Sequence, residues 1–396
     1  MHAVSSVRVR WCPKTTMTIG RVSLLFLSPC RPTAGGTGVA MRAHATCERL
    51  ARRSDVTVVT PDALKPSVVD RGRRWLRFAI PSLSTVVSRD PWDWTRPIRA
   101  VAGTAAACRG PVDRVHVFRF SMAPWAAARL GRCRCDIDLD ESESSTRRDI
   151  AALARRNRHH GLAAAFAQEA EFYERAEREW LPRFDRIFTA SRIEADKVAA
   201  EIPGVDVRVV PNIVPLPDAS PVPDGGGPFT LLFVGTLGYY PNHDAVCHLV
   251  RHILPIWDDR KHGPLRVIVA GQGASRGLRR VMAREPRIEH TGFVADLSGL
   301  YDRADAVVVP LRAGGGTRLK ILESLAWRVP VVATRKAAEG IDVRDGEQVL
   351  LADSPEEIVH ACERLRVDSV LRAALAAAGR RFVEAQHAPA ALAELD

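Results

Sequence analysis

The amino-acid sequence predicts an α/β protein made of two doubly wound, Rossmann-like domains that face each other across a cleft. Short runs of apolar and β-branched residues alternate with longer helical patterns, and strands separated by helices form βαβ units with parallel sheets. A stretch rich in proline and glycine interrupts this alternation, which then restarts. A chain of 396 residues also exceeds one ordinary core and suits two domains.

The first domain is predicted over residues 19–208, after a disordered extension at 1–18 in which Met17 is a second candidate start. Its predicted strands are Arg21–Pro29, Asp55–Pro61, Asp113–Phe120 and Phe184–Ser191. Gly35, Gly36 and Gly38 lie between the first strand and an amphipathic helix. A long charged stretch from Glu141 to Trp180 also has a helical pattern.

Residues 209–229 contain six prolines and three glycines, which disfavour regular elements, so we predict an interdomain linker over 209–228. A second domain is predicted over 229–375. Its predicted strands are Phe229–Leu237, Leu265–Gly273, Ile288–Val294, Ala304–Leu311, Val329–Thr334 and Val349–Asp353. The last segment, 376–396, is predicted as a helix that returns to the first domain.

The chain is basic, with a formal net charge of +11 and a pI near 9.7, which favours anionic partners. Its 57 lysines and arginines are dispersed, aromatic residues make up only 6%, and we find no known nucleic-acid-reading module. Nucleic acid is therefore not an expected partner. A basic face of the first domain that docks on anionic lipid is one alternative, and a solvated basic surface is the other.

Eight cysteines are scattered along the chain without a C-x-x-C pair, a pattern that predicts reduced thiols and no zinc site. No apolar run reaches the roughly 18–20 residues needed to cross a bilayer. We therefore predict a cytoplasmic protein, with peripheral contact at the inner membrane face as an option.

The segment RAGGGTRLKILESLAW, Arg312–Trp327, is the strongest candidate binding site. It directly follows a predicted strand, and its glycines permit backbone shapes that other residues resist. A helix that begins near Thr317 or Arg318 directs free amide groups toward this loop, which suits a phosphate. Lys320 and Glu323 share one helix face and suit the charge and the ribose of a nucleotide. The same residues also fit a flexible loop with a solvated Lys–Glu pair.

Polar candidates in the first domain lie at two strand ends. His116 lies inside an apolar strand, which favours a core histidine, whereas Arg119 near the end of that strand is a better functional candidate. Asp138, Asp140 and Glu141 form a carboxylate run that suits metal or base chemistry. A strand end followed by an acid-rich helix start explains the same run.

Two further positions in the second domain have structural alternatives. Asn242 follows Pro241 and is predicted as a helix N-cap. Glu339 follows the strand at Val329–Thr334, where it either contacts a ligand or stabilises a turn.

Four segments carry a family resemblance. GTLGYYPNHDAVCHLVRHILPIW, VIVAGQG, TGFVADLSGLYDRADAVVVPL and GGGTRLKILESLAWRVPVVATRKAAEGI occur in this order. Together they resemble the nucleotide-sugar-binding domain of the family-4, glycogen-synthase-like glycosyltransferases of GT-B fold. The first half is similar more weakly, through the glycine loop at 35–38, DIDLDESES (Asp136–Ser144) and VVPNIV at the linker. The resemblance covers about residues 19–385.

The resemblance implies retaining transfer of a sugar from a nucleotide-diphosphate sugar to an acceptor, which is a glycan, a lipid or a small molecule. The first domain would bind the acceptor, and no metal or other cofactor is required. Such enzymes usually carry two glutamates with seven residues between them. Glu323 matches the later one, which contacts ribose, and Gly315 stands at the earlier position, as in a subgroup with GGGTRLK.

The chain also lacks the basic residues that many relatives place after the strand at Phe229–Leu237. Arg318 and Lys320 are the nearest substitutes for gripping the diphosphate. The donor-binding residues implied by the resemblance are Gly36, Gly235, Thr236, Gly315, Gly316, Thr317, Arg318, Leu319, Lys320, Glu323 and Glu339. The catalytic candidates are Arg119, Asp138, Lys320 and Glu323.

Two alternatives share this architecture. A sugar-nucleotide epimerase also holds a diphosphate at helix ends, but it needs a set of acids and histidines that the sequence does not assemble. A non-catalytic sugar-nucleotide-binding protein fits the missing glutamate and the basic balance. Transfer or hydrolysis of the donor by the purified protein distinguishes the enzyme from the binding protein.

Overall fold

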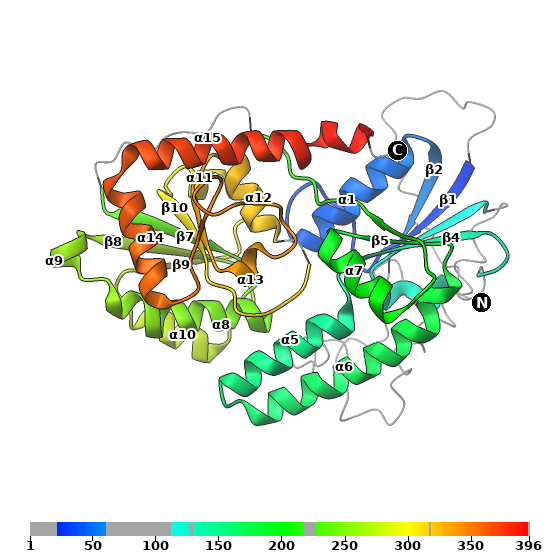
Figure 1. Ribbon diagram of the computed structural model, residues 1–396, viewed down its shortest axis with the longest axis horizontal. Helices are drawn as coiled ribbons and strands as arrows, with labels where there is room; N and C mark the ends of the chain where they lie inside the picture. The colour runs from blue at the N-terminus through cyan, green and yellow to red at the C-terminus, as the bar shows by residue number, and fades with distance from the viewer. Residues whose placement is uncertain (1–21, 61–111, 127–129, 218–226, 317, 395–396) are drawn as a thin grey trace, which may run out of the picture. The chain divides into compact units, whose positions relative to one another are not determined.

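A computed structural model describes residues 22–60, 112–126, 130–217, 227–316 and 318–394 (Figure 1). The chain divides into two compact units, Met1–Val210 and Pro211–Asp396, and the described strands of each unit form one six-stranded sheet. This confirms the predicted α/β class with two Rossmann-like domains. The extension at 1–18, with Met17, and residues 218–226 of the predicted linker lie outside the described residues. The predicted domain limits stay predictions.

The first unit contains a sheet in which all described strand pairs are parallel. Its strands are β1 (Val22–Leu27), β2 (Ser54–Val59), β3 (Arg114–Phe118), β4 (Arg134–Asp140), β5 (Arg186–Thr189) and β6 (Val207–Val209), in the order β2-β1-β3-β4-β5-β6. Its α-helices are α1 (Gly38–Ala51), α5 (Glu143–Arg156), α6 (His160–Trp180) and α7 (Arg192–Glu201), with 3-10 turns at Phe120–Ala126 and Leu181–Arg183.

Helices cover both faces of this sheet because successive strand residues point to opposite sides. Leu25 and Leu27 of β1 belong to the core that contains Trp180 of α6 and Val198 of α7. Leu24 and Phe26 pack instead with Ala43 of α1. The continuous apolar run of β1 therefore reflects burial on both faces, as expected for a parallel sheet.

The helical stretch from Glu141 to Trp180 folds as two packed helices, α5 and α6. The turn between them contains Arg158, which adopts a left-handed backbone with φ +60°. In Figure 1 the two helices lie side by side, and their connecting turn projects away from the sheet of this unit.

The second unit has the strand order β12-β11-β10-β7-β8-β9, again with parallel pairs. Its strands are β7 (Phe229–Val234), β8 (Leu265–Ala270), β9 (Ile288–Gly292), β10 (Ala306–Val309), β11 (Val331–Ala333) and β12 (Leu350–Leu351). Counted from its own first strand, this is the 3-2-1-4-5-6 order of dinucleotide-binding folds, in which ligands bind where the order reverses. In this unit the reversal lies between β7 and β10.

Eight described α-helices and one π-helix belong to the second unit. They are α8 (Tyr240–His248), α9 (Asp259–His262), α10 (Arg276–Ala283), α11 (Ser298–Tyr301), α12 (Leu319–Ala326), α13 (Arg335–Ala338), α14 (Pro355–Val367) and α15 (Ser369–Gln386), together with the π-helix Leu249–Ile253 that continues α8. Two 3-10 turns, Leu254–Ile256 and Pro389–Glu394, complete the helical elements.

The long helix α15 packs on α12 within the second unit (Figure 1). A Cβ atom at Gly379 would lie 2.5 Å from Leu325 Cδ2, so glycine permits this close helix crossing. Arg380 Nη1 donates to the Ala326 carbonyl at 2.6 Å. The C-terminal helix therefore supports the back of α12, and its predicted return to the first domain stays a prediction.

Candidate functional site

The carboxyl ends of β7 and β8 are joined by a glycine-lined contact. Gly235 N donates to the Ala270 carbonyl at 2.9 Å, and Leu237 N donates to the Gln272 carbonyl at 2.7 Å. Gly271 adopts φ +153°, and a Cβ atom there would lie 1.8 Å from the Gly235 carbonyl oxygen. The turn after β7 is thus fixed against its neighbour, at the edge of the sheet where the strand order reverses.

Lys320 of α12 reaches toward this turn. Its Nζ donates to Asn242 Oδ1 at 2.8 Å and lies 4.6 Å from the centroid of the Phe233 ring on β7. A Cβ atom at Gly235 would lie only 2.8 Å from Nζ, so glycine leaves the room that the ammonium occupies. Burial lowers the pKa of Lys320 to about 7, helped by Arg318 and opposed by Glu323.

Glu323 lies one turn further along α12, on the same side as Lys320. Burial raises the pKa of its carboxyl to about 7, and Lys320 opposes that shift. Among the residues that the structure describes, its carboxylate has no hydrogen-bond or ion-pair partner within contact distance. The carboxylate is therefore free to accept hydroxyl groups from a ligand.

Arg318 folds back on the glycine loop. Its Nη1 donates to the carbonyl oxygens of Gly315 and Gly316. Gly314 and Gly316 adopt φ +111° and +70°, which favour glycine, and a Cβ atom at Gly314 would crowd the Arg318 guanidinium at 3.2 Å. The glycine loop is thus closed on itself by an arginine.

The other predicted donor-binding residues of this unit that remain to be placed are Thr236, Leu319, Glu339 and Thr317. Thr236 is exposed in the turn after β7, and Leu319 is buried as the first residue of α12. Glu339 ends α13 and forms an ion pair with Lys336. Thr317 lies outside the described residues.

Asn242 was predicted as an N-cap, and this is wrong. Helix α8 begins at Tyr240, so Asn242 lies within its first turn, and Tyr239 is the N-cap residue. The buried Asn242 side chain instead joins two parts of the site, because its Nδ2 donates to the Thr236 carbonyl at 3.0 Å while its Oδ1 accepts from Lys320. Only the spacing between Asn242 and the end of β7 hinted at this role.

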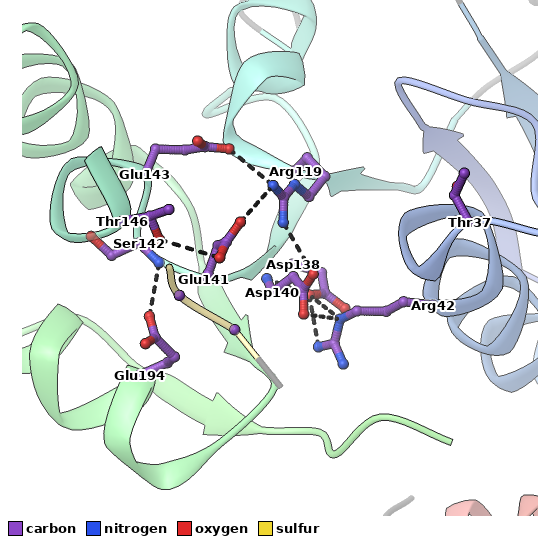
Figure 2. A network of polar contacts seen from close by, with 12 residues as sticks. Thr37, Arg42, Arg119, Asp138, Asp140, Glu141, Ser142, Glu143, Thr146 and Glu194 are labelled. Carbon is purple, nitrogen blue, oxygen red and sulfur yellow. Dashed lines mark hydrogen bonds and ion pairs between the residues drawn. The ribbon is translucent and has the colours of Figure 1, made fainter. Parts of the chain in front are cut away.

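In the first unit, the carboxyl ends of β3 and β4 hold a dense ionic network (Figure 2). Arg119 directly follows β3 with φ +71°, and its guanidinium contacts Asp140 at 3.0 Å, Glu141 at 2.9 Å and Glu143 at 3.2 Å. Asp140 also has a positive φ, +65°, at a shift in strand register. Left-handed backbones at non-glycine residues cluster at functional sites, where surrounding contacts hold them.

Asp138 is fully buried below this network. Its carboxylate accepts from Arg42 Nη2 at 2.9 Å and from the Thr46 hydroxyl at 3.3 Å, and it also accepts from the Asp140 amide at 3.0 Å. Arg42, on α1, donates as well to the Val210 carbonyl at 3.0 Å. The Asp138–Arg42 pair therefore ties α1, the end of β4 and the end of the first unit together. Figure 2 shows Arg42 and Arg119 on opposite sides of Asp138 and Asp140, at the end of β4.

The acid-rich start of α5 is occupied by other carboxylates. Glu194 accepts from the Ser142 amide at 2.9 Å, and Glu177 of α6 accepts from the Glu143 amide at 2.8 Å. Burial raises the pKa of Glu177 to about 7. The alternative interpretation of DIDLDESES, a strand end followed by a helix start, is confirmed by β4 and α5.

His116 is a core residue, as predicted. Its ring stacks on Phe26 and tilts against Phe188, with centroid distances of 5.7 and 5.6 Å. Neither ring nitrogen has a hydrogen-bond partner among the described residues, and burial lowers its pKa to about 3. Gly36 lies in an exposed loop with φ +109°, just before Thr37, whose hydroxyl caps α1.

The structure thus brings Gly235, Thr236, Lys320 and Glu323 together, and separately places Arg119 above Asp138. Sequence reasoning missed Asn242, Phe233 and Arg42 as members of these two sites. Within the described part of the chain, no cluster of His, Cys, Asp and Glu has the arrangement of a metal site. None of the described helices has the length and apolar character needed to cross a bilayer.

Comparison with known families identifies both halves. Residues 228–368 match the model described as glycosyl transferases group 1, and residues 37–213 match a glycosyl transferase 4-like domain. The chain is a glycosyltransferase. It is a transferase of the EC 2.4 class with the GT-B fold, and the resemblance noted in its sequence is confirmed at that level.

Solved structures show the same fold at low identity. Sucrose-phosphate synthase from Thermosynechococcus elongatus has a TM-score of 0.71 and 17% identity, with 95% of this glycosyltransferase and 97% of that chain covered. HepE from Anabaena, in complex with UDP and glucose, has a TM-score of 0.66 and 14% identity, with 95% and 98% covered. A glycosyltransferase from Rickettsia africae has a TM-score of 0.61 and 13% identity, with 95% and 97% covered. No curated protein matches the chain significantly.

Proposed function

We propose that this glycosyltransferase is a retaining enzyme that takes its sugar from a nucleotide-diphosphate sugar held by the second unit. The observation that carries the proposal is the pairing of Lys320 and Glu323 on one face of α12, beside the fixed turn after β7. Lys320 provides charge for the diphosphate, and the free carboxylate of Glu323 accepts the ribose hydroxyls. HepE, a structural neighbour, has been solved with UDP-glucose, which supports the same class of donor.

In this scheme the acceptor hydroxyl attacks the anomeric carbon from the side of the leaving group. The bond from that carbon to the acceptor oxygen forms while its bond to the diphosphate oxygen breaks, and the acceptor proton passes to the diphosphate. The protein supplies orientation and charge stabilisation, so no strong base is needed. Gly235, Thr236, Gly315, Gly316, Thr317 and Leu319 line the donor by this proposal, with Arg318 and Glu339 beside them.

The first unit is proposed to bind the acceptor, which we describe only as a hydroxyl compound. Arg119 and Asp140 have strained backbones at the carboxyl edge of the sheet, which supports a functional role there. We assign Arg119 a polar contact near the reacting groups and Gly36 a contact from the glycine loop. Asp138 acts through Arg42 and the Asp140 amide, since its carboxylate is fully buried.

The test is a thermal-shift panel of UDP-, GDP- and ADP-sugars on the wild type and on Lys320→Ala and Glu323→Ala. We expect one class of donor to raise the melting temperature of the wild type. The same donor should raise the melting temperature of each variant by less. The proposal fails if no nucleotide sugar stabilises the wild type, or if both variants respond like it. Turnover of the stabilising donor, with the anomeric configuration of the product followed by NMR, separates retention from inversion and an enzyme from a binding protein.

Peripheral contact with an anionic membrane is a further proposal, supported by the turn between α5 and α6. Residues 150–168 contain no acidic residue, and Arg155, Arg158 and His160 are exposed there. Each basic residue near an anionic bilayer contributes about 1 kcal/mol. Vesicles containing phosphatidylserine should bind the wild type better than Arg155→Glu/Arg158→Glu. Arg276→Glu/Arg280→Glu, an exposed pair in the second unit, is the matched control, and equal binding by both variants excludes this surface.

A further inference from the structure

The two basic residues of the glycine-loop segment differ in what holds them. The Arg318 guanidinium donates to the carbonyls of Gly315 and Gly316, so it closes the loop. The Lys320 ammonium extends past Gly235 and donates to Asn242. Arg318 and Lys320 are the two candidate substitutes for the basic residues that this chain lacks after β7. Of the two, only Lys320 reaches the turn after β7.

The orientation of the Asn242 amide follows from its partners. The Thr236 carbonyl can only accept a hydrogen bond, and the Lys320 ammonium can only donate one, so Nδ2 must face Thr236 and Oδ1 must face Lys320. Asn242 is buried in the first turn of α8, so its backbone is held by the helix. One side chain therefore fixes the ammonium relative to the turn.

Both described partners of the ammonium are neutral. They are the Asn242 amide oxygen and the face of the Phe233 ring, which is fully buried on β7. An amide takes up one N–H of the ammonium without cancelling its charge, and a ring face attracts a cation without a counter-charge. The charge of Lys320 thus stays available to an anion.

We infer that Asn242 is a positioning residue that holds the Lys320 ammonium at the end of β7, where it serves the diphosphate of the donor. The inference rests on the proposed donor site and adds a residue to it. It also explains why glycine stands at 235, since a Cβ atom there would lie 2.8 Å from Lys320 Nζ and 2.9 Å from Asn242 Nδ2.

The groups around Lys320 fix the expected pH profile. Arg318 lowers its pKa, Glu323 raises it, and burial brings it to about 7. Because an anion binds the protonated amine, nucleoside diphosphate affinity should fall on the order of tenfold per pH unit above that value. In Asn242→Asp a carboxylate replaces the amide oxygen. We expect weaker binding at pH 7 and a decline that begins at higher pH.

The decisive experiment is a double-mutant cycle on the binding of UDP, GDP and ADP, using whichever of these binds the wild type. Asn242→Ala should weaken binding about tenfold in the wild type and not at all in Lys320→Met, because Asn242 acts through the lysine. Lys261→Met, an exposed lysine of the same unit, is the matched control and should leave binding unchanged. If Asn242→Ala causes the same loss of affinity in the wild type and in Lys320→Met, the inference is overturned. A pH profile of binding for Asn242→Asp that is identical to that of the wild type also overturns it.

A readout without ligand separates this inference from the proposed function. Competitive acetylation of the lysines, followed by mass spectrometry, measures the Lys320 pKa directly. Asn242→Asp should raise that pKa and leave the acetylation profile of Lys261 unchanged. If no nucleoside diphosphate binds the wild type, the donor site is refuted. If one binds and the Lys320 pKa does not respond to Asn242→Asp, only the positioning role is refuted.

Discussion

The cations of the two units are held in opposite ways. In the first unit, Arg42 and Arg119 contact carboxylates from β4, the turn that follows it and α5. In the second, Lys320 rests on an amide and a ring face, and the described residues offer it no ion pair. Buried ion pairs cancel their charges and fix a conformation, whereas a cation on neutral partners keeps its charge for a ligand. The comparison separates the structural charge of Arg42 from the charge that we propose Lys320 offers to a ligand.

The largest effect expected from this difference is on stability in the first unit. Arg42→Met leaves Asp138 as a fully buried carboxylate without its cation, which should lower the free energy of unfolding by about 3–5 kcal/mol. Urea denaturation at pH 7 measures this loss of free energy of unfolding. Arg192→Ala, which removes an exposed pair with Asp196, is the control and should cost at most about 1 kcal/mol. Similar losses in the two variants would contradict the structural role of Arg42.

The corresponding change in the second unit should affect binding and spare stability. Lys320→Met removes a cation whose partners are neutral, so the free energy of unfolding should change by less than about 1 kcal/mol. Loss of a charge-assisted contact to the diphosphate should weaken donor binding about 100-fold. Calorimetric titration with the donor and urea denaturation check the two halves of this prediction. A large loss of stability would show that Lys320 is structural like Arg42.

Much of this architecture was predictable, because strands such as β1, β7 and β8 have the apolar run that burial on both faces requires. The site was predictable only in part. The segment at Arg312–Trp327 indicated Lys320 and Glu323 through helical spacing, which is a local property. Asn242 lies 78 residues from Lys320 in the chain and contacts it only because β7 and β10 are neighbours. Arg42 and Asp138 likewise meet across 96 residues, and Val207–Val209 gave too short a run to mark β6.

His116 differs from both Arg42 and Lys320, because neither of its ring nitrogens has a hydrogen-bond partner among the described residues. Its pKa of about 3 lies below the ordinary value of 6.5, so the unfolded chain binds more protons between these values. Stability should therefore fall as pH decreases from 6.5 toward 3. His116→Phe should be more stable than the wild type by about 2 kcal/mol at pH 5.

Urea denaturation at pH 5 and pH 7.5 checks this difference. Glu177 titrates in the same range with the opposite sign, since its raised pKa stabilises the fold below about pH 7. Both proteins contain Glu177, so the difference between them isolates His116. An equal dependence on pH in the wild type and His116→Phe would show that the histidine is not buried in its neutral form.

The smallest effect expected from the comparison comes from one added methyl group. In Gly235→Ala the Cβ atom would meet the far ends of the Lys320 and Asn242 side chains, which can move aside, so folding should lose less than about 1 kcal/mol. The displaced ammonium should bind the donor about tenfold more weakly, because a charge shifted by an ångström loses its alignment. Gly238→Ala, whose Cβ atom would meet the Gly273 carbonyl at 3.4 Å, an ordinary contact distance, is the control in the same turn. If both alanines weaken donor binding alike, the turn itself binds the donor, and Lys320 is then no more a dedicated ligand cation than Arg42.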